Sequence, residues 1–286
     1  MKILLAVDGS KYSRWAAEWL AEIPFATAPQ VKALHVLDTT VWTGPSLFQP
    51  LLQPGFQDNR DLIRKEVSRI EQFAKKVHAD TATVLSDLGL QPKVLVVKGA
   101  TAATILKYNP GRGNLIVVGS RGLNPCEQFL MGGVSTRVMN HAPCSVLVVK
   151  QSPRPVTRLL LATDGSKPAE RALRFLLAEL DPVKNSRILE VLVINVIPFM
   201  KYAALKEAGE AVVCSAGKKL RQAGYRVKEI VEGGDPAEEI LKVSRKKRVD
   251  IILTGARGFG AVARFVLGSV STKLIQHSVC PVLVVR

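Results

Sequence analysis

Lys2-Ile-Leu-Leu-Ala-Val-Asp-Gly-Ser10 recurs later in the same chain as Arg158-Leu-Leu-Leu-Ala-Thr-Asp-Gly-Ser166. In each occurrence a short apolar run ends at Asp-Gly-Ser, a turn sequence. Two further pairs of blocks repeat in the same order: Leu115–Gly122 with Ile251–Gly258, and Ala142–Lys150 with Ser278–Arg286. Three matched blocks in one order indicate that the chain contains two copies of one unit.

The duplication predicts a domain over residues 1–150 and a second over residues 158–286, joined by a linker over residues 151–157. The two prolines of the linker disfavour a helix or a central strand there. The first copy holds about twenty extra residues, and these fall in Asp38–Asp61, which is rich in proline and glycine. We predict that this segment is a mobile or partner-binding loop with three exposed aromatic side chains, Trp42, Phe48 and Phe56.

Apolar strands alternate with amphipathic helices in each copy, most clearly in the second. The strands expected there are Leu159–Ala162, Ile188–Ile197, Val227–Glu232, Asp250–Thr254 and Val282–Val285. The helices expected there are Lys167–Asp181, Leu205–Ala223, Pro236–Lys247 and Ala261–His277. Continuous apolar strands between helices indicate a parallel sheet covered on both faces. The fold class is therefore α/β, with two doubly wound, Rossmann-like domains in tandem.

Composition narrows the possible partners. The 286 residues are 47% hydrophobic and 22% charged, as in ordinary globular proteins. The net charge of +16 favours anionic partners such as nucleotides, nucleic acid or acidic lipids. The dense basic run Arg245–Arg248 closes an expected helix, where cations suit the helix dipole, so nucleic acid is the less favoured partner.

Neither a metal site nor a membrane span is expected. The four cysteines form no C-x-x-C pair, which argues against a metal site and a disulfide framework. No apolar run approaches the ~18 residues of a membrane span, so we expect a soluble, cytoplasmic protein.

A glycine-rich segment follows the fourth strand of each copy. In the second copy Gly255-Ala-Arg-Gly258 precedes, by nine residues, Gly268-Ser-Val-Ser271. Ligands of doubly wound sheets bind beyond the carboxyl ends of the strands, where this segment must lie. Glycine lets backbone N–H groups approach an anion, and a following helix N-terminus favours phosphate. Ser269 and Ser271 are expected to add hydroxyl donors there. No Walker lysine follows, so the segment is not a P-loop.

The spacing Gly-2x-Gly-9x-Gly-Ser, with Asp-Gly-Ser after the first strand and Pro-Val-Leu-Val-Val at the end, resembles the universal stress protein family. The resemblance covers nearly the whole chain, twice. It implies ATP, with or without Mg²⁺, as the ligand of the second copy, and pairing of the final strands as in family dimers. Within one chain that pairing would make an internal pseudo-dimer, and it leaves a homodimer of the chain open.

The resemblance also assigns binding residues. In the second copy these are Ala162, Thr163, Asp164, Val196, Thr254, Gly255, Arg257, Gly258, Gly268, Ser269, Val270 and Ser271. In the first copy they are Asp8, Val36, Gly119, Gly122, Gly132, Gly133 and Ser135. Gly133 stands where the pattern has serine, and Ala100-Thr101 stands where the second copy has Asp235-Pro236, so we expect the first site to be weaker. Asp164 could also serve as a helix cap, which is the structural alternative.

Three functions stay open. The favoured one is an ATP-binding module of a stress response, in which nucleotide is a regulatory or conformational ligand. The sequence places no general base, lysine or pair of metal-binding carboxylates beside the loop, so no catalytic residue and no protein metal site is assigned. The alternatives are a slow ATPase or phosphotransferase, in which Asp164 would hold Mg²⁺, and a nucleotide-free scaffold that binds acidic partners.

Overall fold

The computed structural model describes residues 1–38, 60–91, 93–123, 131–184, 187–198, 202–257 and 267–286. The predicted long loop, with Trp42, Phe48 and Phe56, lies outside these residues apart from its two ends. Gly258 of the predicted phosphate loop lies outside them as well. Among the described helices, none combines the length and the apolar character needed to cross a membrane.

The first copy alternates strand and helix from its second residue. Its elements are β1 (Lys2–Val7), α1 (Lys11–Glu22), β2 (Gln30–Asp38), α4 (Arg60–Asp87), β3 (Lys93–Gly99), α5 (Thr101–Lys107), β4 (Leu115–Gly119), α6 (Gly133–His141) and β5 (Ser145–Val149).

The second copy repeats this order with one added hairpin. Its elements are β6 (Arg158–Ala162), α7 (Lys167–Glu179), β7 (Val183–Lys184), β8 (Arg187–Ile188), β9 (Glu190–Ile197), α8 (Tyr202–Gln222), β10 (Arg226–Gly233), α9 (Pro236–Lys246), β11 (Ile251–Gly255), α10 (Ser269–His277) and β12 (Val282–Val285).

Two boundaries predicted for the second copy are wrong. The strand expected from Ile188 starts at Glu190, because Ile188 pairs with Val183 in the β7–β8 hairpin. Residues 261–266 of the helix expected over Ala261–His277 lie outside the described residues, and within the described part α10 begins at Ser269. Gly268 before it has the extended angles φ −68° and ψ 156°, so it is the N-cap residue rather than part of the helix.

Both copies have the same strand order. The ten-stranded sheet runs β10-β9-β6-β11-β12-β5-β4-β1-β2-β3, so each half has the order 3-2-1-4-5 from its outer edge inward. All neighbours within a half are parallel, as predicted. The order reverses between β1 and β4 and between β6 and β11, and these are the points where doubly wound sheets bind ligands.

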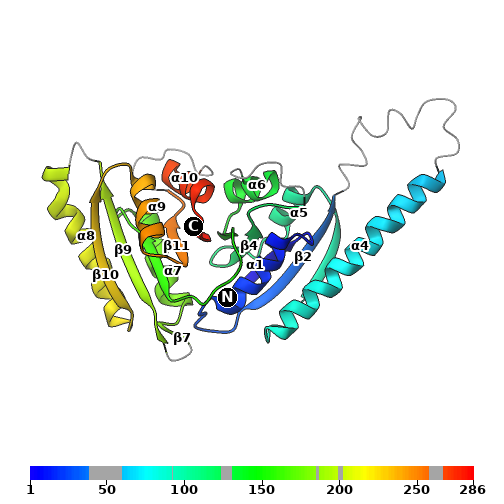
Figure 1. Cartoon of the computed structure of the whole chain (residues 1–286), viewed down its shortest axis with the longest axis horizontal. Coiled ribbons are helices and arrows are strands. Elements are labelled where there is room, and N and C mark those ends of the chain that lie inside the picture. Colours follow the sequence, from blue (N-terminus) through cyan, green and yellow to red (C-terminus); the bar gives the residue numbers. More distant parts are fainter. Residues whose placement is uncertain (39–59, 92, 124–130, 185–186, 199–201, 258–266) are drawn as a thin grey trace.

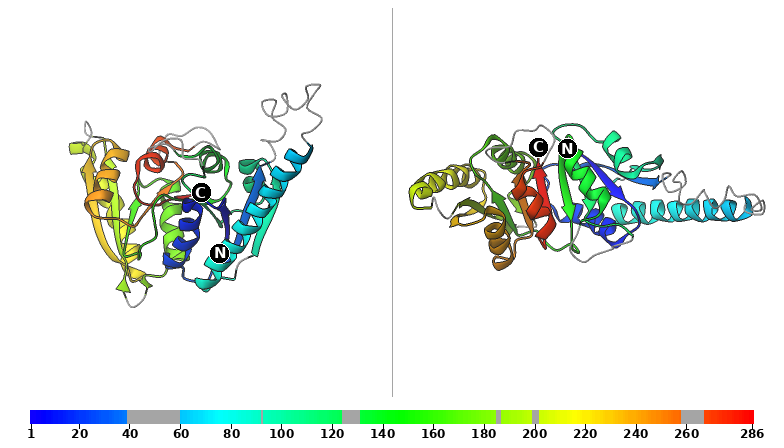
Figure 2. Two further views of the ribbon diagram at one scale, coloured as in Figure 1. Left: turned by 45° about the vertical axis from the view of Figure 1, so that its right-hand side comes forward. Right: turned by 90° about the horizontal axis from the view of Figure 1, so that it is seen from above.

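Helices cover both faces of the sheet, as Figures 1 and 2 show. One core contains Trp19 of α1, Leu173 of α7 and the inward residues of the strands that face them. The second core lies on the other face, with Met139 of α6 and Leu274 of α10 fully buried. Because the strands carry apolar residues on both faces, they read as continuous hydrophobic runs in the sequence.

The two copies join through their last strands. β12 pairs antiparallel with β5, with Val282 opposite Val148 and Val284 opposite Val146. This contact confirms the prediction that the final apolar strands cover each other within one chain, and α10 and α6 lie side by side above it (Figure 1). Trp19 Nε1 also donates to the carbonyl oxygen of Gln151 at 2.9 Å, which holds the start of the linker against α1.

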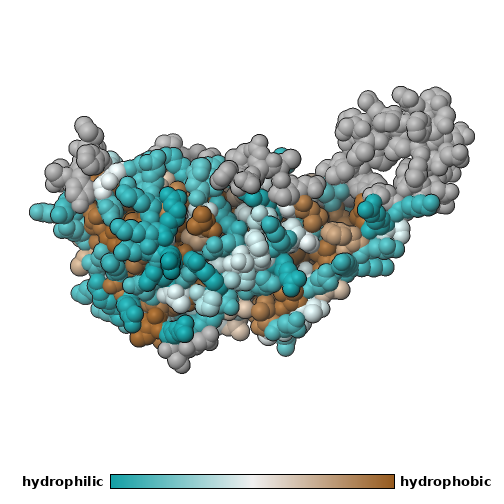
Figure 3. Space-filling view, viewed as in Figure 1, coloured by the Kyte–Doolittle hydropathy of each residue, from teal (hydrophilic) through white to brown (hydrophobic). Residues whose placement is uncertain are grey.

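The α4 helix extends beyond the body of the first copy (Figures 1 and 2). Its exposed Phe73 and Val67, and Val96 on the neighbouring strand β3, are hydrophobic. Figure 3 shows hydrophobic side chains along the inner side of α4, whereas the second copy presents a mostly hydrophilic surface in that view.

Candidate functional site

A cavity of about 480 Å³ lies at the switch point of the second copy, between the carboxyl ends of β6, β9 and β11 and the start of α10. It brings together every predicted residue of the second copy that the structure describes. These are Ala162, Thr163, Asp164, Val196, Thr254, Gly255, Arg257, Gly268, Ser269, Val270 and Ser271. Pro236, which the sequence contrasts with Thr101 of the first copy, also lines the cavity, and sequence reasoning missed Ala169, Ile194, Pro198 and Ile240.

The Asp-Gly-Ser turn presents Asp164 to this cavity. Gly165 has φ +78°, a left-handed conformation that glycine adopts without strain. Ser166 caps α7 by accepting a hydrogen bond from the Ala169 N–H at 3.4 Å. Asp164 Oδ1 instead accepts from the Ser166 N–H at 3.0 Å. Ser166 is therefore the N-cap residue of α7, and the alternative that Asp164 is the helix cap is wrong.

Gly255 has a packing reason to be glycine. A Cβ atom there would lie 2.5 Å from the carbonyl carbon of Pro168, closer than side chains tolerate. The corresponding Gly119 of the first copy would meet Tyr12 in the same way, at 2.7 Å. Glycine at these positions thus lets β11 pass close to α7 and β4 pass close to α1, independently of any contact with a ligand.

The N-terminus of α10 lies at the cavity, where its first N–H groups have no intrahelical partners. Gly268 has no side chain to cap them, and no described side chain does so. The exposed Ser269 hydroxyl forms no hydrogen bond with any described residue. The buried Ser271 hydroxyl, however, donates to the Gly255 carbonyl oxygen at 2.8 Å. Ser271 therefore offers a ligand its backbone N–H rather than the hydroxyl donor that the sequence suggested.

The opposite wall of the cavity is apolar. Val196 and Pro198 lie at the end of β9, and Ile240 of α9 is buried against the same core. Asn195 Nδ2 donates to the Thr163 carbonyl oxygen at 2.8 Å and thus ties the ends of β6 and β9 together. The cavity accordingly has an apolar end beside β9 and a polar end beside α10.

Asp235 fixes the start of α9 at the rim. Its Oδ1 accepts from the N–H groups of Ala237 at 3.0 Å and Glu238 at 3.1 Å. Lys273 of α10 contacts its other oxygen at 3.1 Å. The hydrogen bond from the Glu238 backbone is the main reason that the pKa of Asp235 lies below its usual value, with Lys273 adding to the effect.

The first copy repeats the polar framework. Asp8 Oδ1 accepts from the Ser10 N–H at 3.0 Å, and the Ser135 hydroxyl donates to the Gly119 carbonyl oxygen at 2.7 Å. Gly132 is the N-cap residue of α6, again without a side-chain cap, and Gly133 has open space where a Cβ would project. Val36 lies buried on β2, and Gly122 lies so close to Asp8 that a Cβ would be 2.8 Å from its Oδ2.

Two substitutions set the first copy apart, and sequence reasoning missed both. Tyr12 stands where the second copy has Pro168, and its hydroxyl accepts a hydrogen bond from Arg121 Nη1 at 3.1 Å. Asp38 stands where the second copy has Pro198, and its Oδ2 accepts from the Thr101 hydroxyl at 2.7 Å. Aligning the two copies residue by residue would have shown both differences. The first binds the loop arginine to α1, and the second supplies from β2 the cap that Ala100 cannot give α5.

No group of three or more His, Cys, Asp or Glu side chains in the described part of the chain is placed to hold a metal ion. Asp164 is the carboxylate that lines the cavity. A Mg²⁺ ion bound to nucleotide phosphates commonly takes one or two protein carboxylates and keeps several waters. One carboxylate among the described lining residues fits Mg²⁺ that arrives already bound to an anionic ligand, but not a site built from protein ligands alone.

The fold and the cavity define a class of protein: a tandem, doubly wound α/β protein with a ligand cavity at the carboxyl edge of its parallel sheet. The chain belongs to the universal stress protein family, whose family model matches residues 1–150 and 155–286.

Known proteins resemble the chain over its whole length. The universal stress protein Slr1230 of Synechocystis is 24% identical over 99% of both chains. The crystal structure of a universal stress protein from Archaeoglobus fulgidus has a TM-score of 0.68 at 23% identity, covering 100% of this chain and 98% of that one. A family protein from Arabidopsis thaliana, solved with AMP bound, matches 45% of this chain and 90% of its own at 18% identity, with a TM-score of 0.34.

Proposed function

We propose that this chain is a regulatory ATP-binding protein of a stress response, and that its second copy holds the nucleotide. The observation that carries the proposal is that one cavity joins an apolar wall to an uncapped helix N-terminus. Adenine matches the apolar wall, and the phosphates match the helix end, where N–H groups and the dipole favour negative charge.

The adenine ring would lie beside Val196 and Pro198, with Ile240 on the side of α9. Recognition of an adenine edge there falls to backbone groups at the end of β9. Asp164 lies between this wall and the helix, where its carboxylate could accept hydrogen bonds from ribose hydroxyls. An apolar wall and a few convergent polar groups are the usual composition of a small-molecule site.

The phosphates would meet Ser269, Arg257 and the first N–H groups of α10. Arginine is well suited to this role because its planar fork of N–H donors matches phosphate oxygens. Mg²⁺ accompanying the nucleotide would neutralise part of the phosphate charge, and Asp164 is the residue that would hold it.

Nucleotide here would act as a conformational ligand. Asp164 and Arg257 are the ionisable side chains among the described residues that line the cavity. A hydrolase needs a group that positions or deprotonates water, and Asp164 is then the one candidate. The C-terminal end of α10 is followed, after four residues, by β12, which pairs with β5 of the first copy. Ordering α10 around phosphates would therefore act on the junction between the copies.

Asp164 also supports the alternative of a slow ATPase or phosphotransferase. Its carboxylate lines the cavity, where it could hold Mg²⁺ or orient water. Steady-state hydrolysis by wild type and by Asp164→Asn separates the two functions. We expect wild-type turnover far below the ~1 s⁻¹ typical of enzymes. Turnover at that scale, abolished by Asp164→Asn, would establish the enzyme instead.

Binding itself is tested on the full chain without added ligand. The purified protein is denatured, and the released small molecules are identified by mass spectrometry; we expect adenine nucleotide. Calorimetric titration with ATP and with GTP then measures preference, and ATP should bind more tightly. Protein that releases no nucleotide and gives no heat with ATP at millimolar concentration would instead be the nucleotide-free scaffold.

A further inference from the structure

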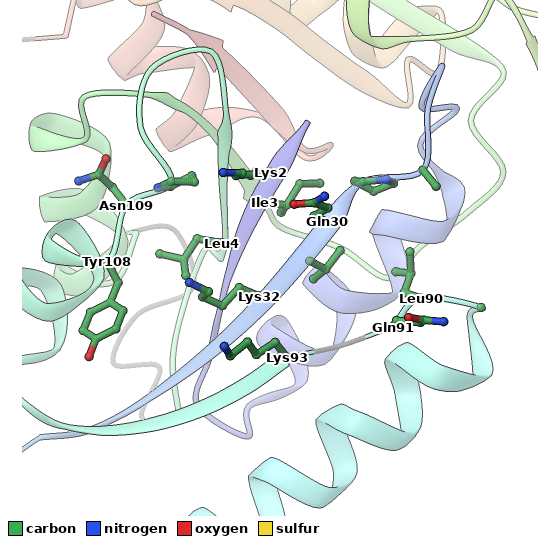
Figure 4. Close-up of a pocket in the computed structure, with 15 residues that line it drawn as sticks. Lys2, Ile3, Leu4, Gln30, Lys32, Leu90, Gln91, Lys93, Tyr108 and Asn109 are labelled. Atoms are coloured by element: carbon green, nitrogen blue, oxygen red, sulfur yellow. The ribbon is translucent and has the colours of Figure 1, made fainter.

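A larger cavity, of about 830 Å³, lies at the opposite edge of the sheet, beside the amino ends of β1, β2 and β3 of the first copy. Figure 4 shows Lys2, Lys32 and Lys93 extending into it from these three strands, with Tyr108 and Asn109 from the end of α5 on one side. The cavity proposed to hold ATP lies at the carboxyl ends of the strands of the second copy, and the two cavities share no residue.

Strand register brings the three lysines to one face of the sheet. Lys32 pairs directly with Lys93 across β2 and β3, and Leu4 pairs with Lys32 across β1 and β2. Lys2 precedes Leu4 by two residues, and side chains two apart in a strand share a face. The ammonium groups therefore gather over the face that α5 covers, where Leu4 is buried.

No counter-charge accompanies these lysines in the described part of the chain. The residues that line the cavity include no aspartate or glutamate, and none of the three lysines forms an ion pair with a described residue. Like charges directly opposite each other on neighbouring strands destabilise a sheet. The pairing of Lys32 with Lys93 is thus a cost to the folded protein that a bound anion would relieve.

At the corresponding end of the sheet in the second copy, the basic side chain is paired with an acid. Arg158 occupies the position of Lys2 and forms an ion pair with Glu190, which occupies the position of Gln30. Asp250 accepts from the Arg158 N–H at 2.8 Å, whereas Asn114 accepts from the Lys2 N–H at 2.8 Å. Each acid of the second copy is replaced in the first by its uncharged amide counterpart.

The residue at the position of Lys32 and the helix that covers it also differ between the two copies. Leu192 occupies the position of Lys32 and is buried under α9, which is eleven residues long. The corresponding α5 has seven residues, so the first copy leaves the amino ends of its strands less covered. Where the second copy has a leucine, two acids and a longer covering helix, the first copy has a lysine, two amides and a shorter helix.

We propose that this cavity binds a small organic molecule that carries at least two phosphate groups. Its volume lies in the range of about 300–1,000 Å³ found for small-molecule sites. Three lysines supply point charges for phosphate. Tyr108 and Pro110, beside the end of α5, supply apolar surface for the organic body. The lysines converge on a hollow rather than following a stripe along the surface, which favours a compact ligand over nucleic acid.

Calorimetry tests the proposal with two named probes, fructose 1,6-bisphosphate and inorganic tripolyphosphate. Both are titrated into the full chain without ATP, because ATP itself carries three phosphates and would compete for the lysine cavity; the part of the binding that depends on Lys32 reports this cavity. We expect wild type to bind the probes, and Lys32→Leu, which installs the residue of the second copy, to weaken binding by about tenfold or more. Tighter binding of the bisphosphate than of the inorganic ion identifies the organic body as part of the ligand.

Lys228→Gln is the matched control, because Lys228 occupies the position of Lys93 in the second copy. It should leave binding of both probes unchanged. Lys32→Gln is a second variant that still tests the proposal if leucine disturbs folding. Without ligand, both Lys32 variants should melt at or above the wild-type temperature, because the like-charge pair of Lys32 and Lys93 is gone. Absence of binding by wild type, or equal binding by wild type and Lys32→Gln, overturns the proposal. A twelve-nucleotide single strand that binds more tightly than either probe would overturn the assignment to a small molecule.

The result is independent of the proposed ATP function. The Ser269→Gly variant changes the other cavity and should bind fructose 1,6-bisphosphate as wild type does. If the chain binds no ATP at the second copy, the dependence of probe binding on Lys32 is expected to persist.

Discussion

Lys150 and Arg286 each end one copy of the repeat and bind the last helix of the other. Lys150 Nζ donates to the carbonyl oxygens of Ser278 at 2.8 Å and Gln276 at 3.0 Å, at the end of α10. Arg286 Nη2 donates in turn to the carbonyl oxygen of Met139, at the end of α6. Both cations sit at the negative end of a helix dipole. The start of α10 lines the cavity of the second copy, so the first copy holds the far end of that helix.

The protonation of Lys150 should be visible in the pH dependence of stability. Burial is the main cause that lowers its pKa to about 8, from 10.5, with Arg121 adding to the effect. Between pH 8 and 9 the unfolded chain therefore binds more protons at this group than the folded chain does, so stability rises with pH. Below pH 8 both states are protonated and the contribution is constant.

The measurement is the free energy of unfolding in urea at pH 7, 8 and 9 for wild type and Lys150→Met. The wild-type minus variant difference should increase by up to about 1 kcal/mol from pH 8 to pH 9. Higher pH is avoided because burial raises the pKa of Cys144 to about 11, which makes stability fall once unfolded thiols ionise. A difference that stays flat, or decreases, would show that Lys150 titrates as an ordinary lysine.

The two nucleotide-type sites should differ in affinity for ATP. Ser269 offers a hydroxyl that Gly133 lacks, and Tyr12 binds the loop arginine Arg121 in the first copy. A net contribution of ~1 kcal/mol from the hydroxyl corresponds to roughly fivefold in affinity. Ser269→Gly should weaken the second site by that factor, and Gly133→Ser should strengthen the first, where a Cβ has open space. Calorimetric titration decides, and equal affinities at the two wild-type sites would show that these differences do not matter.

Gly255 should tolerate no side chain. Gly255→Ala places a Cβ against the backbone of Pro168, so we expect a loss of about 1–3 kcal/mol in the free energy of unfolding. Gly133→Ala is the control, because no atom lies within 4 Å of a Cβ there and alanine favours a helix. Urea denaturation of both variants measures the contrast. Comparable stabilities would mean that the strand and the helix can move apart at Gly255 without cost.

Asp38 should stabilise the first copy as a cap supplied from outside the helix. It accepts from the Thr101 hydroxyl and N–H, whereas the N-cap residue Ala100 provides no side-chain bond. Asp38→Ala should lower the free energy of unfolding by about 1 kcal/mol. The double variant Asp38→Ala, Ala100→Asp should recover most of that loss, since it recreates the local cap that Asp235 forms in the second copy. Failure of the second change to restore stability would assign Asp38 another role.

The sequence was sufficient for the fold because its signals are local or repeated. The apolar runs that begin at Lys2 and Arg158 alternate with helical periodicity, which predicts the parallel sheet, and the apolar final strands predict the junction between β5 and β12. The cavity of the second copy was also predictable, since Asp164 and Ser269 follow strands that end at the same edge of the sheet.

Other features depend on pairings that a sequence does not display. Lys32 and Lys93 are far apart in the chain, and only strand register makes them neighbours. The hydroxyl of Ser271 reads as a phosphate donor until the structure places it against Gly255. The start of α10 was misplaced because the residues before it look helical by composition, whereas Gly268 has extended backbone angles and is the N-cap residue.

The pairing of β5 with β12 inside one chain has a consequence for how the copies can evolve. A protein assembled from separate identical subunits cannot alter one without altering the other, whereas here each molecule always contains one of each. The mixed composition is set by the gene and does not depend on subunit exchange or on concentration. One copy can therefore keep Ser269 and an open cavity at the carboxyl edge, while the other commits Arg121 to Tyr12 and gathers lysines at the opposite edge. Because the two copies are joined in one chain, each can have a different function, and the two are always present in a ratio of one to one.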